Sequence, residues 1–246
     1  MYKKAAIISL CLIFFNFYSV YSASSTLIFK KRLAIIIDDM GYSKKEAKEF
    51  ASLNIPLAYS FLPDAIYTKI LSKMLADEGY TIMVHMPSEP LDYPKDNPGK
   101  NAIYINNSKK RTEYLLERAK RSIYHPIGLN NHMGSRILED KNQMDYIMEF
   151  LKKYNMFFVD SETTPRSVGT KEAEKFKVPA AKRIVFLDNK KNVQYIEGQI
   201  NKAVLLLKRH NEVVAVGHCN EKTYEALKQR LEYIKPYVVD IKYLVR

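Results

Sequence analysis

Short apolar runs along this sequence end in side chains that can bind a metal ion or move a proton. The runs cover residues 33–37, 81–84, 157–159, 184–187 and 213–217, and the residues that end them are Asp38 with Asp39, His85, Asp160, Asp188 and His218. Each run has the composition of a buried parallel strand. Because the carboxyl ends of parallel strands meet at one edge of a sheet, we expect these side chains to gather around one site.

The adjacent pair Asp38-Asp39 offers two carboxylates to that site. Neighbouring residues of a strand point to opposite faces, but where the strand ends the backbone can turn both side chains toward one cavity. One carboxylate would then bind a metal ion while the other acts as a base beside it. The alternative is an aspartate pair that caps the helix expected after Gly41.

Two histidines follow other predicted strands in surroundings that suit a ligand. His85 begins the motif His-Met-Pro-Ser-Glu-Pro, whose prolines restrict the loop that leaves the histidine. His132 lies in Asn-Asn-His-Met-Gly-Ser, where small residues let the backbone approach a ligand. A lone histidine is more often structural, so these two histidines indicate a metal site only together with the strand-end aspartates.

One aspartate and two histidines suit Zn²⁺ or another divalent ion, with one coordination position left open for water. Such an ion lowers the pKa of the water and polarises a carbonyl group. Asp38 would then accept the proton of the water, and His218 would donate a proton to the leaving group. These residues together predict metal-assisted hydrolysis of an amide or an ester.

Strand and helix patterns alternate along the chain, as repeated βα units require. Helices are expected after the N-caps Ser43 and Ser108 and over 140–154, 171–177, 193–210 and 221–234, and a last strand over 238–244. About seven such units in one domain predict an α/β fold of the distorted (β/α) barrel type, and a flat doubly wound sheet is the alternative. The proline-rich segment 86–107 is expected to form a long loop over the functional edge, as a lid or a binding wall.

The first 22 residues have the pattern of a secretory signal peptide. Lys3 and Lys4 precede an apolar segment over 5–20, and small residues follow, with cleavage expected after Ser22. An uncleaved anchor is the alternative, because the apolar segment approaches the length that spans a bilayer. We expect the domain at 30–246 to be exported to the periplasm or cell envelope, with no membrane span after cleavage. Cys219 would then have no intrachain disulfide partner.

The chain is basic, because 39 lysines and arginines outnumber 27 aspartates and glutamates and give a formal net charge of +12. A basic surface favours anionic partners such as cell-wall polymers. The lysines are spread over the predicted helices, and the sequence has no basic stripe interleaved with aromatic residues. Nucleic acid is therefore not expected as a partner.

Several short motifs resemble those of the divergent polysaccharide deacetylase family. They are Ile-Ile-Ile-Asp-Asp-Met-Gly (35–41), His-Met-Pro-Ser-Glu-Pro (85–90), Asn-Asn-His-Met-Gly-Ser (130–135), Val-Asp-Ser-Glu-Thr-Thr (159–164), Val-Phe-Leu-Asp-Asn (185–189) and Val-Gly-His (216–218). The resemblance runs in order from about residue 33 to the C-terminus. It implies a branch of the NodB-type deacetylases, whose distorted (β/α) barrel holds a divalent metal ion.

By this resemblance Asp38 corresponds to the catalytic base, Asp39 to the metal-binding carboxylate and His218 to the general acid. His85 and His132 are the candidate metal imidazoles, although the better-known deacetylases place both metal histidines close together on one segment. Further candidates for substrate contacts or supporting hydrogen bonds, from their positions in the sequence, are Glu89, Asn131, Arg136, Asp160 and Asp188. A surface charge is the alternative for Glu89. Ordinary salt bridges are the alternative for Arg136, Asp160 and Asp188. Cys219 stands where many relatives have proline, and its thiol is a further candidate for a weak ligand.

The sequence thus predicts an exported, metal-dependent deacetylase that hydrolyses acetyl amide or ester groups. The expected partner is an acetylated cell-envelope polysaccharide or a peptidoglycan-like glycan, and the expected cofactor is a divalent metal, with Zn²⁺ as the first candidate. The alternative is a protein that keeps the barrel and the metal but works by binding a glycan or an envelope partner.

Overall fold

The computed structural model describes residues 31–246. The predicted signal peptide at 1–22 lies outside the described residues. Within the described range, no helix combines the length and the apolar character needed to cross a bilayer.

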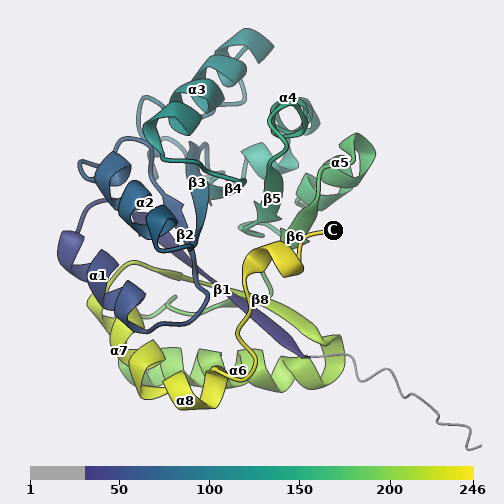
Figure 1. Ribbon diagram of the computed structural model, residues 1–246. Helices are drawn as coiled ribbons and strands as arrows, with labels where there is room; N and C mark the ends of the chain where they lie inside the picture. Colours follow the sequence, from purple (N-terminus) through teal and green to yellow (C-terminus); the bar gives the residue numbers. More distant parts are fainter. Residues whose placement is uncertain (1–30) are drawn as a thin grey trace, which may run out of the picture.

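Eight parallel strands form one curled sheet, and the helices pack around its outside (Figure 1). The strands are β1 (Arg32–Met40), β2 (Ala58–Phe61), β3 (Thr81–Ser88), β4 (Gly128–Met133), β5 (Phe157–Asp160), β6 (Ala180–Lys182), β7 (Val185–Phe186) and β8 (Glu212–His218). Their order across the sheet is β6-β5-β4-β3-β2-β1-β8-β7, so β6 and β7 are edges and the barrel is incomplete. The predicted barrel class is confirmed, and the flat doubly wound alternative is wrong.

Short polar side chains satisfy free backbone N–H groups at five of the helix starts, those of α1, α3, α4, α6 and α7. The described range contains eight α-helices. They are α1 (Lys44–Ser52), α2 (Thr68–Asp77), α3 (Lys109–Ser122), α4 (Lys141–Lys153), α5 (Gly169–Phe176), α6 (Val193–His210), α7 (Glu221–Gln229) and α8 (Leu231–Ile234), with 3₁₀ turns at Ile137–Glu139 and Ile241–Tyr243. The expected caps Ser43 and Ser108 each accept a hydrogen bond from the N–H three residues on. The last long helix, expected over 221–234, is interrupted at Arg230.

Both faces of the sheet are apolar, as the continuous apolar runs require. Along β1, Leu33, Ile35 and Ile37 belong to the large outer core under the helices. Ala34 and Ile36 alternate with them and belong to a second cluster inside the curl. This period of two follows from the strand geometry, which sends successive side chains to opposite faces.

The expected last strand over 238–244 is wrong. Only Val238 forms a bridge, to Leu33 of β1, and the chain then turns into the 3₁₀ helix Ile241–Tyr243. Ile241 and Leu244 are both buried in the inner cluster, and a spacing of three residues suits a 3₁₀ turn rather than a strand. The apolar residues of this segment therefore match a helical turn.

The C-terminal segment, residues 238–246, crosses the beginnings of several strands (Figure 1). Besides the bridge to Leu33 in β1, the Thr81 hydroxyl at the start of β3 donates to both Asp240 carboxylate oxygens at 2.8 Å. At the start of β6, the Ala180 N–H donates to the Arg246 carbonyl over 2.7 Å. The segment thus closes the amino end of the barrel and leaves the carboxyl end open for the site.

Candidate metal centre

The ends of β1, β3, β4 and β8 place their polar residues side by side. Asp38 in β1 is in register with His218 in β8, and His85 in β3 is in register with Asn130 in β4. His132 lies two residues beyond Asn130, on the same face of β4. The pairing of parallel strands therefore brings together residues that are far apart in the sequence.

The backbone of Asp39 turns both aspartates of the pair toward the same space. Asp39 has a φ of 56°, in the left-handed region that aspartate and asparagine enter more readily than most residues. The pairing of β1 with β2 is irregular between Ile37 and Met40, which marks a bulge at this position. The bulge breaks the alternation of the strand, so Asp38 and Asp39 need not face opposite sides of the sheet.

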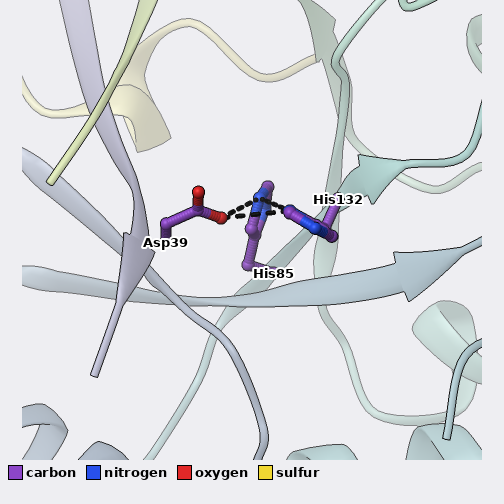
Figure 2. Close-up of side chains that lie close together, drawn as sticks. All are labelled: Asp39, His85 and His132. Carbon is purple, nitrogen blue, oxygen red and sulfur yellow. Dashed lines mark hydrogen bonds and ion pairs between the residues drawn. The ribbon is translucent and has the colours of Figure 1, made fainter. Parts of the chain in front are cut away.

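Asp39, His85 and His132 direct three ligand atoms at one point (Figure 2). Asp39 Oδ1 lies 3.0 Å from His132 Nδ1 and 3.3 Å from His85 Nε2, and the two imidazole nitrogens are 3.2 Å apart. Asp39 Oδ1 is buried and accepts no hydrogen bond from any residue in the described range 31–246. A buried carboxylate oxygen without a donor, facing two imidazole nitrogens, fits a bound divalent cation.

The electrostatics of Asp39 agree with this arrangement. Burial opposes its ionisation, but the facing His132 and His85 outweigh that effect and hold the pKa of Asp39 well below its usual range. The carboxylate is therefore charged at neutral pH, as a metal ligand must be. With a neutral carboxylate and two neutral imidazoles, Zn²⁺ would lose most of its attraction to this set.

Asn130 fixes the orientation of the His85 ring. His85 Nδ1 lies 2.8 Å from Asn130 Oδ1, which also accepts the Ser60 hydroxyl over 2.6 Å. The Asn130 amide nitrogen donates to Asp38 Oδ1 over 2.8 Å. Since an amide oxygen can only accept, His85 carries its proton on Nδ1 and presents the lone pair of Nε2 to the metal point.

Asp38 is a buried carboxylate at the same strand end. Its solvent exposure is 2%, and Asn130 and His85 are its polar neighbours. Burial raises the pKa of Asp38, although the nearby His85 and His218 act in the opposite direction. A raised pKa brings a carboxylate closer to the range in which it can accept a proton at neutral pH.

His218 approaches the metal residues from β8 and is held by Asp188. His218 Nδ1 lies 3.0 Å from Asp188 Oδ1, and the His218 backbone N–H donates to Asp188 Oδ2 over 2.9 Å. Asn220 and Thr223 also donate to Asp188 Oδ2, so the carboxylate is fully engaged. The free His218 Nε2 lies 4.0 Å from Asp39 Oδ2. Asp188 thus aims an imidazole nitrogen at the metal point.

The pKa of His218 reflects two opposing influences. Burial disfavours the imidazolium, but the hydrogen bond and the charge of Asp188 outweigh it and raise the pKa of His218 to about 9. Asp188 itself is buried, yet the same contacts lower its pKa. His218 is therefore protonated at neutral pH and can donate a proton.

The other predicted site residues shape the loops around the centre. Glu89 forms an ion pair of 3.0 Å with Arg136 and accepts the Ile105 N–H over 2.9 Å. Asn131 donates to the Met133 carbonyl over 2.6 Å. Glu89, Asn131 and Arg136 therefore stabilise the loops that follow β3 and β4. They do not belong to the three-residue metal set.

Asp160 and Cys219 also lie outside the metal set. Asp160 accepts the Ser167 hydroxyl over 2.6 Å and the Glu162 N–H over 2.8 Å, which organises the loop after β5. Cys219 Sγ lies 3.8 Å from a Glu46 carboxylate oxygen of α1. Burial and the charge of Glu46 raise the pKa of the Cys219 thiol, so the thiolate that a metal ligand requires is disfavoured.

Two residues near the site are missing from the sequence-based set. Asn130 could have been predicted from the alternation of side chains along a strand, because it lies two residues before His132 and therefore on the same face. Arg183 donates to the Ser161 and Glu162 carbonyls over 2.6 Å and 2.8 Å, and its guanidinium lies 5.0 Å from the Phe186 ring centroid. Arg183 thereby links the end of β5 to β7 across the open seam between β6 and β7. No local sequence pattern marks it.

The chain belongs to the divergent polysaccharide deacetylase family, whose sequence profile matches residues 35–245. Among curated proteins it is similar to the uncharacterized protein YibQ of Escherichia coli K12, at 29% identity over 89% of this chain and 68% of YibQ. The crystal structure of the uncharacterized protein ATU2773 from Agrobacterium tumefaciens C58 matches with a TM-score of 0.81 and 20% identity, over 88% of this chain and 89% of that one.

More distant solved structures share the fold. The peptidoglycan N-acetylglucosamine deacetylase Bc1960 matches with a TM-score of 0.55 and 15% identity, over 87% of each chain. A family 4 acetyl xylan esterase from Clostridium thermocellum, solved with a cobalt ion, matches with a TM-score of 0.54 and 10% identity, over 87% of this chain and 90% of that one. At these identities the likeness shows a common barrel, and the activity of this chain has to be argued from its own residues.

Proposed function

We propose that this protein is an exported, metal-dependent hydrolase that removes amide- or ester-linked acetyl groups from a cell-envelope polysaccharide. The observation that carries the proposal is the convergence of Asp39, His85 and His132 on one point, between the buried carboxylate Asp38 and the imidazole of His218. Metal ligands, a base and an acid are the three parts that hydrolysis of an acetyl group needs. The deacetylase family and fold support the same reaction class.

A divalent cation, which we propose to be Zn²⁺, would be held by Asp39, His85 and His132 and would activate water and polarise the acetyl carbonyl. Asp38 accepts the proton of the attacking water, because burial raises its pKa and Asn130 holds the carboxylate in place. His218 then gives a proton to the departing sugar nitrogen or oxygen. Asp188 keeps the His218 ring protonated and oriented for that step.

Export is the part of the proposal that depends on the sequence alone. The basic start, the apolar segment over 5–20 and the small residues after it support secretion by a signal peptide. An exported enzyme would reach envelope polysaccharides, and the family name suggests polysaccharides as substrates. A fusion of residues 1–30 to a periplasmic reporter tests this part, and a reporter that stays inside the cell would contradict it.

The chemical proposal is tested with Asp38→Asn. We expect acetate release from an acetylated glycan to fall by about 10²- to 10⁴-fold, the usual contribution of a general base. The protein should still bind one equivalent of zinc, because Asp38 is outside the ligand set. Asp160→Asn is the matched control, since Asp160 is also a buried strand-end aspartate but contacts Ser167 and Glu162 instead.

Two outcomes would contradict the proposal. One is full acetate release by Asp38→Asn, which would remove the assigned base. The other is a wild-type protein that carries a full equivalent of zinc yet releases no acetate from amide- or ester-acetylated glycans. In that case full complementation of a deletion strain by Asp38→Asn would favour the alternative role, a metal-containing protein that works by binding.

A further inference from the structure

A cleft opens directly beside the metal centre. It has a volume of about 300 Å³, and His132, one of the three metal residues, is part of its lining. Its walls are the connection between β2 and α2 at 62–64 and the tip of the long loop at 98–101, with Tyr42 and Pro87 completing the lining. This volume lies at the small end of ligand sites, which suits a single sugar ring.

The two walls of the cleft are joined by Asp64. Asp64 forms an ion pair with Arg118 of α3, and the side-chain amide of Asn101 donates to Asp64 Oδ2 over 2.7 Å. Farther along the loop, Ile103 bridges to Ser88 at the end of β3. The tip at 98–101 is therefore held at its C-terminal side, and Lys100 and Asn101 line the cleft.

The turn at Gly41 positions an aromatic face at the cleft. Gly41 has a φ of 119°, and a Cβ at this position would lie 2.4 Å from Thr68 Oγ1, so only glycine fits against α2. Its carbonyl accepts the Tyr67 N–H over 2.9 Å. The next residue, Tyr42, is 61% exposed although it lines the cleft. An aromatic ring with prolines and one amide nearby is a lining typical of small-ligand sites.

Positive charge is in excess around the cleft. The carboxylate of Asp64 is neutralised by Arg118 behind the wall. Lys100 lines the cleft and forms no ion pair with any residue between 31 and 246. The charge of Lys100 also acts on Asp64, so two cations, Arg118 and Lys100, stand against this one carboxylate. An excess of positive charge beside a cleft favours a ligand that carries an anionic group.

We propose that this cleft binds a carboxylate-bearing sugar unit adjacent to the acetylated unit, with Lys100 pairing with the carboxylate. Tyr42 packs against the sugar ring. The side-chain oxygen of Asn101, whose amide nitrogen donates to Asp64, accepts a hydrogen bond from a sugar hydroxyl. The inference rests on the proposed function for the identity of the neighbouring unit. It defines the substrate class as an acidic glycan.

The test compares two hexasaccharides by calorimetry, on zinc-loaded full-length protein carrying Asp38→Asn so that no turnover occurs. One alternates glucuronic acid with N-acetylglucosamine, and the other is neutral and built from N-acetylglucosamine alone. We expect the acidic glycan to bind more tightly, and Lys100→Gln to weaken it by about fivefold to tenfold while the neutral glycan is unaffected. Lys100→Arg should restore most of the affinity.

Lys95→Gln is the matched control, because Lys95 is exposed on the same loop but does not line the cleft. The inference is overturned if Lys100→Gln behaves like Lys95→Gln, if it weakens both glycans equally, or if the protein binds neither glycan. Its failure is separable from that of the proposed function. Lysine-dependent binding without acetate release by the wild type would refute the deacetylase alone, and acetate release that ignores Lys100 would refute the cleft alone.

Discussion

The two ends of the barrel are made from the same strands but have opposite chemistry. At the carboxyl end, polar side chains gather, and about a third of the Asp39 and His218 side-chain surface stays open to solvent. At the amino end, the C-terminal segment covers the strand starts with Ile241 and Leu244, which are 1% and 6% exposed. The carboxyl end therefore stays accessible for chemistry, whereas the C-terminal segment covers the amino end.

The two ends of the barrel contribute differently to stability and function. Ile36 and Val216 lie in the inner cluster that Ile241 and Leu244 complete, and burial of these apolar side chains stabilises the fold. The carboxyl end instead holds groups that lower the stability of the fold. They are the buried carboxylate of Asp38 and Asp39 Oδ1, which accepts no hydrogen bond from the described residues. Substitutions at the two ends should consequently separate metal binding from folding.

The largest effect is expected from Asp39→Asn at the carboxyl end. Asp39 supplies the one anionic ligand of the set, and a neutral amide cannot replace it. Zinc binding should therefore fall from one equivalent to none, and acetate release should be lost with it. Metal analysis after dialysis measures this directly. Asp77→Asn is the control, because Asp77 is paired with Lys73 on the surface. Stoichiometric zinc in Asp39→Asn would mean that the three residues do not form the metal set.

Ile241→Ala tests the other end of the barrel. Removing a fully buried side chain from the inner cluster should lower the free energy of unfolding by about 2 to 5 kcal/mol, measured by urea denaturation of the metal-free protein. Zinc stoichiometry at low temperature should not change. Tyr243→Ala in the same 3₁₀ turn is the control, since Tyr243 is 62% exposed. A loss of zinc in folded Ile241→Ala would break the separation between the two ends.

The carboxyl end of the barrel was predicted from the sequence better than the amino end. A buried parallel strand needs a continuous apolar run, and a functional edge needs polar residues where the run stops, so Asp38, His85 and His218 are visible from local pattern alone. β6 escaped prediction because it has only three residues, none of them fully buried. Ile241 and Leu244 were assigned to a strand because an apolar segment at a chain end does not reveal its period over so few residues.

The supporting contacts of the site were harder to predict than its reactive groups. Asn130 joins His85 to Asp38 because β3 pairs with β4 in one particular register, and that register depends on packing between distant segments. Asp188 was among the expected residues, but its hold on His218 depends on the pairing of β7 with β8. Local sequence indicates which residues can react, whereas the tertiary structure decides how they are aimed.

Asn130→Ala should have an intermediate effect that is confined to the carboxyl end. Without the amide, His85 loses the partner that keeps its proton on Nδ1, so zinc affinity should fall by about 10- to 100-fold. Competition with a chelator measures the change. Asn131→Ala is the neighbouring control, because the Asn131 side chain bonds to the Met133 carbonyl instead of a metal imidazole. Equal losses in the two variants would argue that loop support, and not the His85 tautomer, explains the effect.

The smallest expected effect is a shift in pH dependence caused by Asp188→Asn. Burial disfavours protonated His218, but Asp188 raises the pKa of His218 to about 9. A general acid works while it is protonated, so activity is present below this pKa and is lost as the pH rises through it. A neutral amide removes the favourable charge, and the basic limb of kcat/KM should move about 1 to 3 units toward lower pH. Zinc binding should stay close to that of the wild type.

The pH profile between pH 5 and 10 distinguishes this role of Asp188 from a structural one. A structural defect would lower kcat/KM at every pH, whereas loss of the charge next to His218 moves the limb and spares activity at low pH. Asp160→Asn, at the end of β5, should leave the limb in place because Asp160 contacts Ser167 and not His218. If the limb of Asp188→Asn coincides with that of the wild type, His218 is not the proton donor. The carboxyl end would then hold a metal and a base without an acid.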